Sequence, residues 1–170
     1  MAIAILGAPL SRAENKIKMG ILEIIGMSGS PTERLLETLS DLAAKNQALA
    51  DRLSRHAGLC VYPSMKAALE RLAAKESEHL ATLGAILAQH RRSPKSTQLP
   101  ARNGANNWER LTGDLAILAE LSSELGRQAI HWEALDPDTA QRLQTIVDED
   151  SHVLGELRKL ALRADPQALD

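Results

Sequence analysis

The chain has 170 residues, which is enough for one domain with a substantial buried core. Charged residues make up 25% of it, and their signs nearly balance at a net charge of −2, so neither nucleic acid nor a membrane surface is expected as a partner. It has no phenylalanine, one tyrosine and two tryptophans, a composition that favours a helical core over a β-sheet. The single cysteine excludes an internal disulfide and suits a reducing compartment, so we expect a cytoplasmic protein.

The first 30 residues contain two short apolar stretches, 1–10 and 21–27. Both are too short to cross a bilayer, and no basic residues or cleavage site mark a signal peptide. We therefore expect residues 1–30 to form an N-terminal arm, either flexible or docked on the bundle or a protein partner. The bundle itself should span 31–165, followed by a tail at 166–170.

Apolar residues recur every three or four positions in four segments, at about 31–56, 63–90, 107–135 and 137–163. The first and last of these begin with prolines at a favourable first helical position. Residues 91–107 are polar and contain two prolines and a glycine, which indicates a linker. This order predicts an all-α, antiparallel four-helix bundle, built from two helical hairpins joined by a longer crossover.

The pattern Glu-x-x-His occurs twice, at Glu76–His79 and at Glu149–His152. Residues three apart are neighbours on one helix face. On a helical wheel Glu76 lies about 20° and His79 about 40° from the middle of the apolar stripe of their helix. A buried carboxylate must be paired, protonated or bound to a cation, so this pair is the main candidate for a functional site.

The second Glu-x-x-His pair, Glu149–His152, does not lie on the apolar stripe of its helix. On its wheel Asp150 lies near the centre of the apolar stripe, whereas Glu149 is about 90° and His152 about 150° away from it. In a straight helix His152 would point to solvent or to another subunit.

The stretches Tyr62–Leu83 (YPSMKAALERLAAKESEHLATL) and Asp136–Leu157 (DPDTAQRLQTIVDEDSHVLGEL) resemble the second and fourth helices of ferritin-like proteins such as rubrerythrins and bacterioferritins. In that superfamily each of these helices supplies a glutamate and a histidine to a pair of iron or manganese ions. The resemblance therefore implies a ferritin-like bundle with a metal site whose ligands are Glu76, His79, Glu149 and His152.

The family places one further glutamate on each of its first and third helices. At the corresponding inward positions this sequence has Asn46 and Ser122, while Glu120 is level with Glu149 but points away. The additional polar candidates for the core are Asn46, Asp114, Asp150 and Glu120. A neutral amide is a weak substitute for a bridging carboxylate, so Asn46, Glu76, His79, Asp114 and Asp150 could instead form a buried hydrogen-bonded network that fixes helix register.

Two functions remain open at this point. One is a di-iron or di-manganese protein that handles oxygen, peroxide or iron; the other is a metal-free interaction or structural module that has lost such a site. No catalytic residue is predicted, and a homodimer or larger assembly is expected. His56, near the end of its helix, is interpreted as a helix cap.

Overall fold

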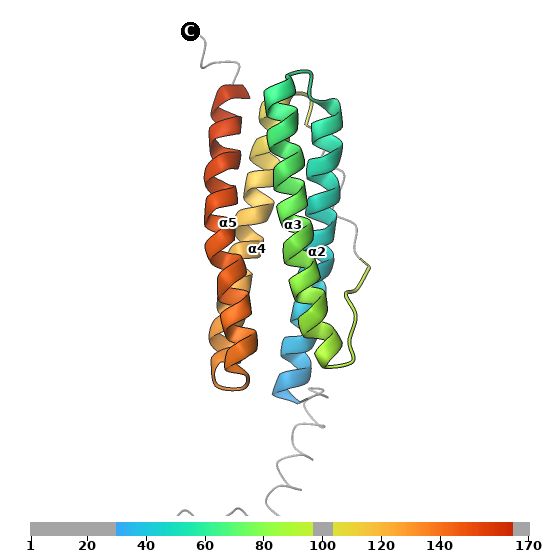
Figure 1. Ribbon diagram of the computed structural model, residues 1–170, viewed down its shortest axis with the longest axis vertical. Helices are drawn as coiled ribbons and strands as arrows, with labels where there is room; N and C mark the ends of the chain where they lie inside the picture. Colours follow the sequence, from blue (N-terminus) through green and yellow to red (C-terminus); the bar gives the residue numbers. More distant parts are fainter. Residues whose placement is uncertain (1–29, 97–103, 165–170) are drawn as a thin grey trace, which may run out of the picture. The chain divides into compact units, whose positions relative to one another are not determined.

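The computed structural model describes residues 30–96 and 104–164, which form four helices. Helix α2 covers Pro31–Leu59, α3 Pro63–Gln89, α4 Asn107–Glu133 and α5 Pro137–Ala164. No strand occurs among the described residues, so the all-helical prediction is confirmed. From Leu35 onward the helices lie side by side, as expected of a helical bundle (Figure 1). The predicted N-terminal arm, the middle of the linker and the tail lie outside the described residues.

The helix ends follow from local capping chemistry. Ser30 and Glu33 form a reciprocal capping box at the start of α2, with each backbone N–H donating to the other side chain at 2.9 and 3.1 Å. At the start of α5, the Thr139 hydroxyl donates to the Asp136 carboxylate at 2.7 Å, and this bond lowers the pKa of Asp136. Pro137 then occupies the first helical position, where its missing N–H does no harm.

The apolar core is built mainly from leucine and alanine. Trp132, 1% exposed, is the one buried aromatic side chain of the three in the chain. The side chains with no exposed surface come from all four helices: Leu39, Leu49, Leu53, Leu83, Ile86, Leu87, Leu118, Leu143 and Leu157. None of the described helices combines the length and the hydrophobicity needed to cross a bilayer.

The described start of the linker runs along α2 (Figure 1). The Ser40 hydroxyl donates to the Ser93 carbonyl at 2.8 Å, and Lys95 pairs with Glu37 at 3.1 Å and with Asp41 at 2.9 Å. Because the linker covers this side of α2, the helix buries polar Ser40 in addition to its apolar stripe.

Helix α3 ends in a Schellman motif. The Arg92 N–H donates to the Leu87 carbonyl at 2.9 Å, and the Arg91 N–H donates to the Ala88 carbonyl at 3.0 Å. Arg91 therefore adopts a left-handed conformation with φ of 58°, which usually belongs to glycine.

We expect Arg91→Gly to stabilise the protein by up to about 1 kcal/mol, because glycine removes the strain of the left-handed conformation. Gln89→Gly, two residues earlier and still helical, should destabilise it by about 1 kcal/mol. Urea unfolding of both variants measures the two free energies. Equal destabilisation by both substitutions would contradict the capping interpretation.

Candidate metal-binding site

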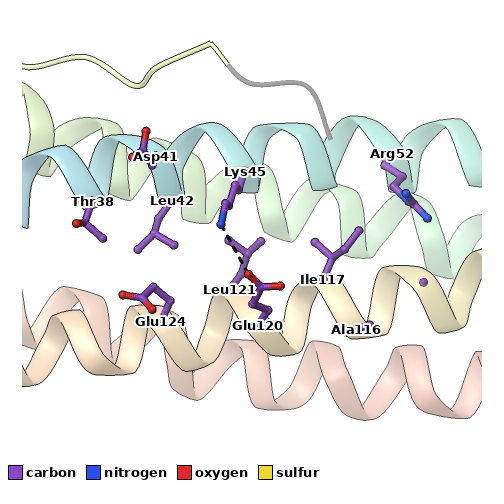
Figure 2. Close-up of a pocket in the computed structure, with 11 residues that line it drawn as sticks. Thr38, Asp41, Leu42, Lys45, Arg52, Ala116, Ile117, Glu120, Leu121 and Glu124 are labelled. Carbon is purple, nitrogen blue, oxygen red and sulfur yellow. Dashed lines mark ion pairs between the residues drawn. The ribbon is translucent and has the colours of Figure 1, made fainter. Parts of the chain in front are cut away.

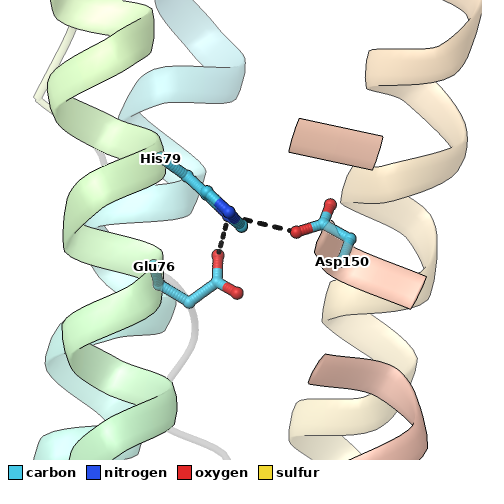
Figure 3. A group of neighbouring side chains, drawn as sticks. All are labelled: Glu76, His79 and Asp150. Atoms are coloured by element: carbon cyan, nitrogen blue, oxygen red, sulfur yellow. Dashed lines mark ion pairs between the residues drawn. The ribbon is translucent and has the colours of Figure 1, made fainter. Parts of the chain in front are cut away.

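Three acidic and imidazole side chains meet in the core between α3 and α5. Glu76 and His79 come from α3 and Asp150 from α5, and they are 0%, 2% and 1% exposed. They point toward one another (Figure 3). One ligand atom from each lies within 4.8 Å of the others, which is close enough for all three to contact one cation.

The distances within this group are short. His79 Nδ1 lies 3.1 Å from Asp150 Oδ1 and 3.6 Å from Glu76 Oε2. From α2, the Asn46 amide donates to the same Glu76 oxygen at 2.6 Å. The site therefore draws on three helices, each of which supplies a side chain from its inward face.

A second pair of charges closes the site toward the surface. His79 Nε2 donates to Glu149 Oε2 at 3.0 Å, and Lys75 Nζ lies 3.0 Å from Glu149 Oε1. The Glu149 side chain is 40% exposed, so it forms the outer wall of the site. Hydrogen bonds from Lys75 and from His79 lower the pKa of Glu149, and the pKa of Lys75 is raised in turn.

The imidazole of His79 is surrounded by carboxylates. Burial lowers the pKa of His79, but its contacts with Asp150 and Glu76 outweigh burial and raise it to about 10. Without a metal ion, His79 is therefore protonated at neutral pH. One imidazolium balances only one of the two buried carboxylates when both are ionised, which leaves an excess negative charge in the core.

His79 Nδ1 and Asp150 Oδ1 pair with each other at 3.1 Å. Two other buried polar atoms of the site, Asn46 Oδ1 and Glu76 Oε1, lack a hydrogen-bond partner within the described part of the chain. Each such buried atom is destabilising by roughly 1–3 kcal/mol. One carboxylate oxygen each from Glu76 and Asp150, together with an imidazole nitrogen of His79, forms a donor set that suits a divalent cation.

The ligands predicted from the two Glu-x-x-His motifs are only partly brought together. Glu76 and His79 lie in the core, and Glu149 reaches His79 from the surface side. His152 is exposed and does not join the group, as its position on the wheel indicated. The inward residues of α5 are instead Asp150 and Val153, each one position later than the motif.

The additional candidates for buried polar residues do not all belong to the site. Asn46 and Asp150 belong to the site, whereas Asp114 is buried elsewhere. Glu120 is 76% exposed and lies 3.7 Å from Lys45, so its inclusion among the core polar residues was wrong. It sits on the outer side of α4, two positions from buried Ser122.

A second buried cluster joins α2 to α4. Arg52 Nε donates to Asp114 Oδ1 at 2.5 Å, and His56 Nδ1 donates to Asp114 Oδ2 at 2.6 Å. All three side chains are at most 4% exposed. A Cβ at Gly113 would lie 2.9 Å from Arg52 Nη2, so glycine leaves room for the guanidinium.

His56 lies in the last turn of α2, as predicted, but its contact with Asp114 was not predicted, and Arg52 was missed. The spacing of Arg52 and His56 in the sequence could have indicated this cluster. Arg52 and His56 are four residues apart beside the buried Leu49 and Leu53, and Asp114 follows buried Leu111 by three residues on α4.

Two surface grooves accompany these clusters. One of about 500 Å³ lies between α2 and α4; Leu42, Ile117 and Leu121 line it, with Arg52 at one end (Figure 2). The other, of about 340 Å³, lies between α3 and α5 and is lined by Lys75 and Glu149 among others. The second groove reaches the outer wall of the metal-binding candidate and so offers an entry path for an ion.

Comparison with known protein families gave no match, and neither did comparison with curated proteins. The site is therefore interpreted from its own geometry.

We expect Asp114→Ala to destabilise the fold by about 3–5 kcal/mol, because it leaves Arg52 and His56 buried without their shared carboxylate. Glu120→Ala, on the same helix, should change stability by less than about 1 kcal/mol because its ion pair is exposed. Chemical denaturation compares the two variants. A small effect of Asp114→Ala would show that the cluster contributes little to folding.

The raised pKa of His79 predicts a pH-dependent contribution to stability. Since the folded state holds the proton more tightly, this contribution is complete below pH 6.5 and is lost as pH rises toward about 10. In chelator, the difference in unfolding free energy between wild type and His79→Gln should therefore shrink over this range. A difference that stays constant or grows would contradict the assignment.

Proposed function

We propose that this chain is a ferritin-like, antiparallel four-helix bundle protein that binds one divalent transition-metal ion through Glu76, His79 and Asp150. The observation that carries the proposal is the convergence of two buried carboxylates and one buried imidazole, with unsatisfied donor atoms, at a single point between α3 and α5. Such groups are rarely buried without a partner that balances their charge.

Charge balance favours a divalent ion. Two carboxylates and a neutral imidazole carry two negative charges, which one such ion would neutralise completely, whereas protonation of His79 neutralises only one. Imidazole together with carboxylate oxygens suits iron, manganese or zinc rather than calcium or magnesium, which prefer oxygen donors alone. Asn46, whose amide N–H donates to Glu76, has a buried amide oxygen with no hydrogen-bond partner among the described residues.

The number of ions follows from the register of α5. A two-metal centre of the ferritin type needs a second inward histidine, and the corresponding position holds Val153, while His152 is exposed. We therefore propose one ion in place of the pair that the family resemblance implies. Iron or manganese held there would supply one-electron chemistry toward oxygen or peroxide.

The residues around the site have separate roles in this proposal. Glu76 and Asp150 supply charge, His79 supplies nitrogen after it loses its proton, and Asn46 orients Glu76. Glu149 controls access from the groove between α3 and α5, because its contacts with Lys75 and His79 close that side. A cytoplasmic location and a homo-oligomeric state are also part of the proposal and rest on the sequence.

The second candidate function is a metal-free structural or interaction module. The cluster of Arg52, His56 and Asp114 favours it, because here the same chain buries charged groups in a set that is paired without any metal. In this case protonated His79 would join Glu76 to Asp150 only to fix the register of α3 against α5.

Metal titration of chelator-treated protein with Mn²⁺, Fe²⁺, Co²⁺ and Zn²⁺ tests the proposal. We expect about one ion per chain, a ligand-field absorption spectrum with Co²⁺, and a stabilisation of about 2.7 kcal/mol at a metal concentration one hundred times the Kd. Glu76→Gln and His79→Ala should abolish binding. His152→Ala is the matched control and should bind normally, because His152 lies outside the group.

The outcomes separate the two candidates. Binding of two ions, or loss of binding in His152→Ala, would favour a conventional two-metal centre. No binding by the wild type, together with a Glu76→Gln variant as stable as the wild type or more so, would establish the metal-free module.

A further inference from the structure

One end of the bundle exposes apolar and aromatic side chains. In the short connection between α2 and α3, Val61 is 80% and Tyr62 61% exposed, and Leu59 at the end of α2 is 56% exposed. Trp108, at the start of α4, is 38% exposed. The Asn107 amide lies 3.8 Å from Cys60 Sγ, which brings the start of α4 next to this connection. We call Leu59, Val61, Tyr62 and Trp108 the apical patch.

The apical patch contains two of the three aromatic residues in the chain. The third, Trp132, is buried. A protein with so few aromatics would gain most stability by burying them, since they carry the largest apolar surfaces. Their placement at one exposed end therefore indicates a binding role.

Exposed basic residues outnumber exposed acidic ones around the apical patch, where Glu109 beside Trp108 and Glu156 on α5 are the acidic residues and Lys66 pairs with Glu70 at 4.0 Å. No acidic residue occurs between Asp51 and Glu70, whereas Arg55 and Lys66 are exposed there. The last turns of α5, at the same end of the bundle (Figure 1), carry exposed basic side chains at Arg158, Lys159 and Arg163. The near-neutral net charge of the whole chain thus conceals a local positive excess.

The size of this end decides between possible partners. With helix axes about 10 Å apart, the end of a four-helix bundle measures roughly 400 Å². A stable protein–protein interface needs about 800 Å² on each partner. A bilayer needs no such area, because a few inserted side chains flanked by basic residues are enough for reversible binding.

We propose that the apical patch binds the surface of an anionic phospholipid bilayer, with Val61 and Tyr62 inserted at the headgroup level and the basic residues facing the lipid phosphates. Tyrosine and tryptophan favour this interfacial zone because their rings are apolar at one side and polar at the other. The inference is independent of the metal site.

Co-sedimentation of the full chain with vesicles tests this proposal. We expect binding to phosphatidylcholine mixed with phosphatidylserine, little binding to phosphatidylcholine alone, and weaker binding as salt is raised. The double variant Val61→Ser/Tyr62→Ser should bind about tenfold more weakly or worse, because it removes two inserted apolar groups. Lys66→Glu should bind at least about fivefold more weakly.

The matched control uses two exposed apolar side chains far from the apical patch. Ile130 and Leu135 are 70% and 52% exposed near the turn between α4 and α5. Ile130→Ser/Leu135→Ser should bind vesicles like the wild type. A blue shift of tryptophan emission on binding gives an independent readout, because Trp108 would enter the interface while buried Trp132 reports no change.

Three results would overturn the proposal. The first is equal binding to neutral and anionic vesicles, and the second is no binding at low salt. The third is concentration-dependent self-association that Val61→Ser/Tyr62→Ser abolishes, with no vesicle binding, which would identify a second copy of the chain as the partner of the patch. Circular dichroism of each variant verifies that the fold is intact.

Discussion

The contact between His79 and its two buried carboxylates is the interaction on which the rest of the molecule depends. Glu76 and Asp150 come from different helices and meet in a core whose apolar part is mainly leucine and alanine. Their mutual repulsion would push α3 and α5 apart unless a positive charge lies between them. A protonated imidazole and a metal ion are two ways to supply that charge, so the packing of these helices and the function of the site have the same physical origin.

The two buried clusters have complementary roles in the fold. Asn46, Glu76, His79 and Asp150 connect α2, α3 and α5, whereas Arg52, His56 and Asp114 connect α2 with α4. Leucine side chains alone tolerate sliding of one helix along another, because neighbouring turns present similar surfaces. Charged pairs do not tolerate it, since a shift of one turn would leave each of them buried and unpaired. Together the clusters specify a single register for all four helices.

The sequence predicted much of the fold because periodicity and capping act locally. The spacing of leucines located the four helices, and the wheel placed Glu76 and Asp150 toward the core. Contacts between helices were harder to predict from the sequence. The pairing of Asp114 with Arg52, for example, depends on the axial offset of α2 against α4, which no local pattern encodes. The end of α3 at Gln89 agrees with the predicted end to within one residue, but the left-handed conformation of Arg91 was not predicted, since this residue type rarely adopts it.

The register of α5 shows why spacing alone does not define a site. Glu149 and His152 have the spacing of a ligand pair, yet the residues that face the core are Asp150 and Val153. A rotation of the helix by one residue, about 100°, turns the histidine of the motif to the surface and places Val153 at the interior position instead. The half-exposed Glu149 side chain nevertheless contacts His79, with His79 Nε2 3.0 Å from Glu149 Oε2. The register of α5 thus keeps a carboxylate in the core, Asp150, but not the histidine of the motif.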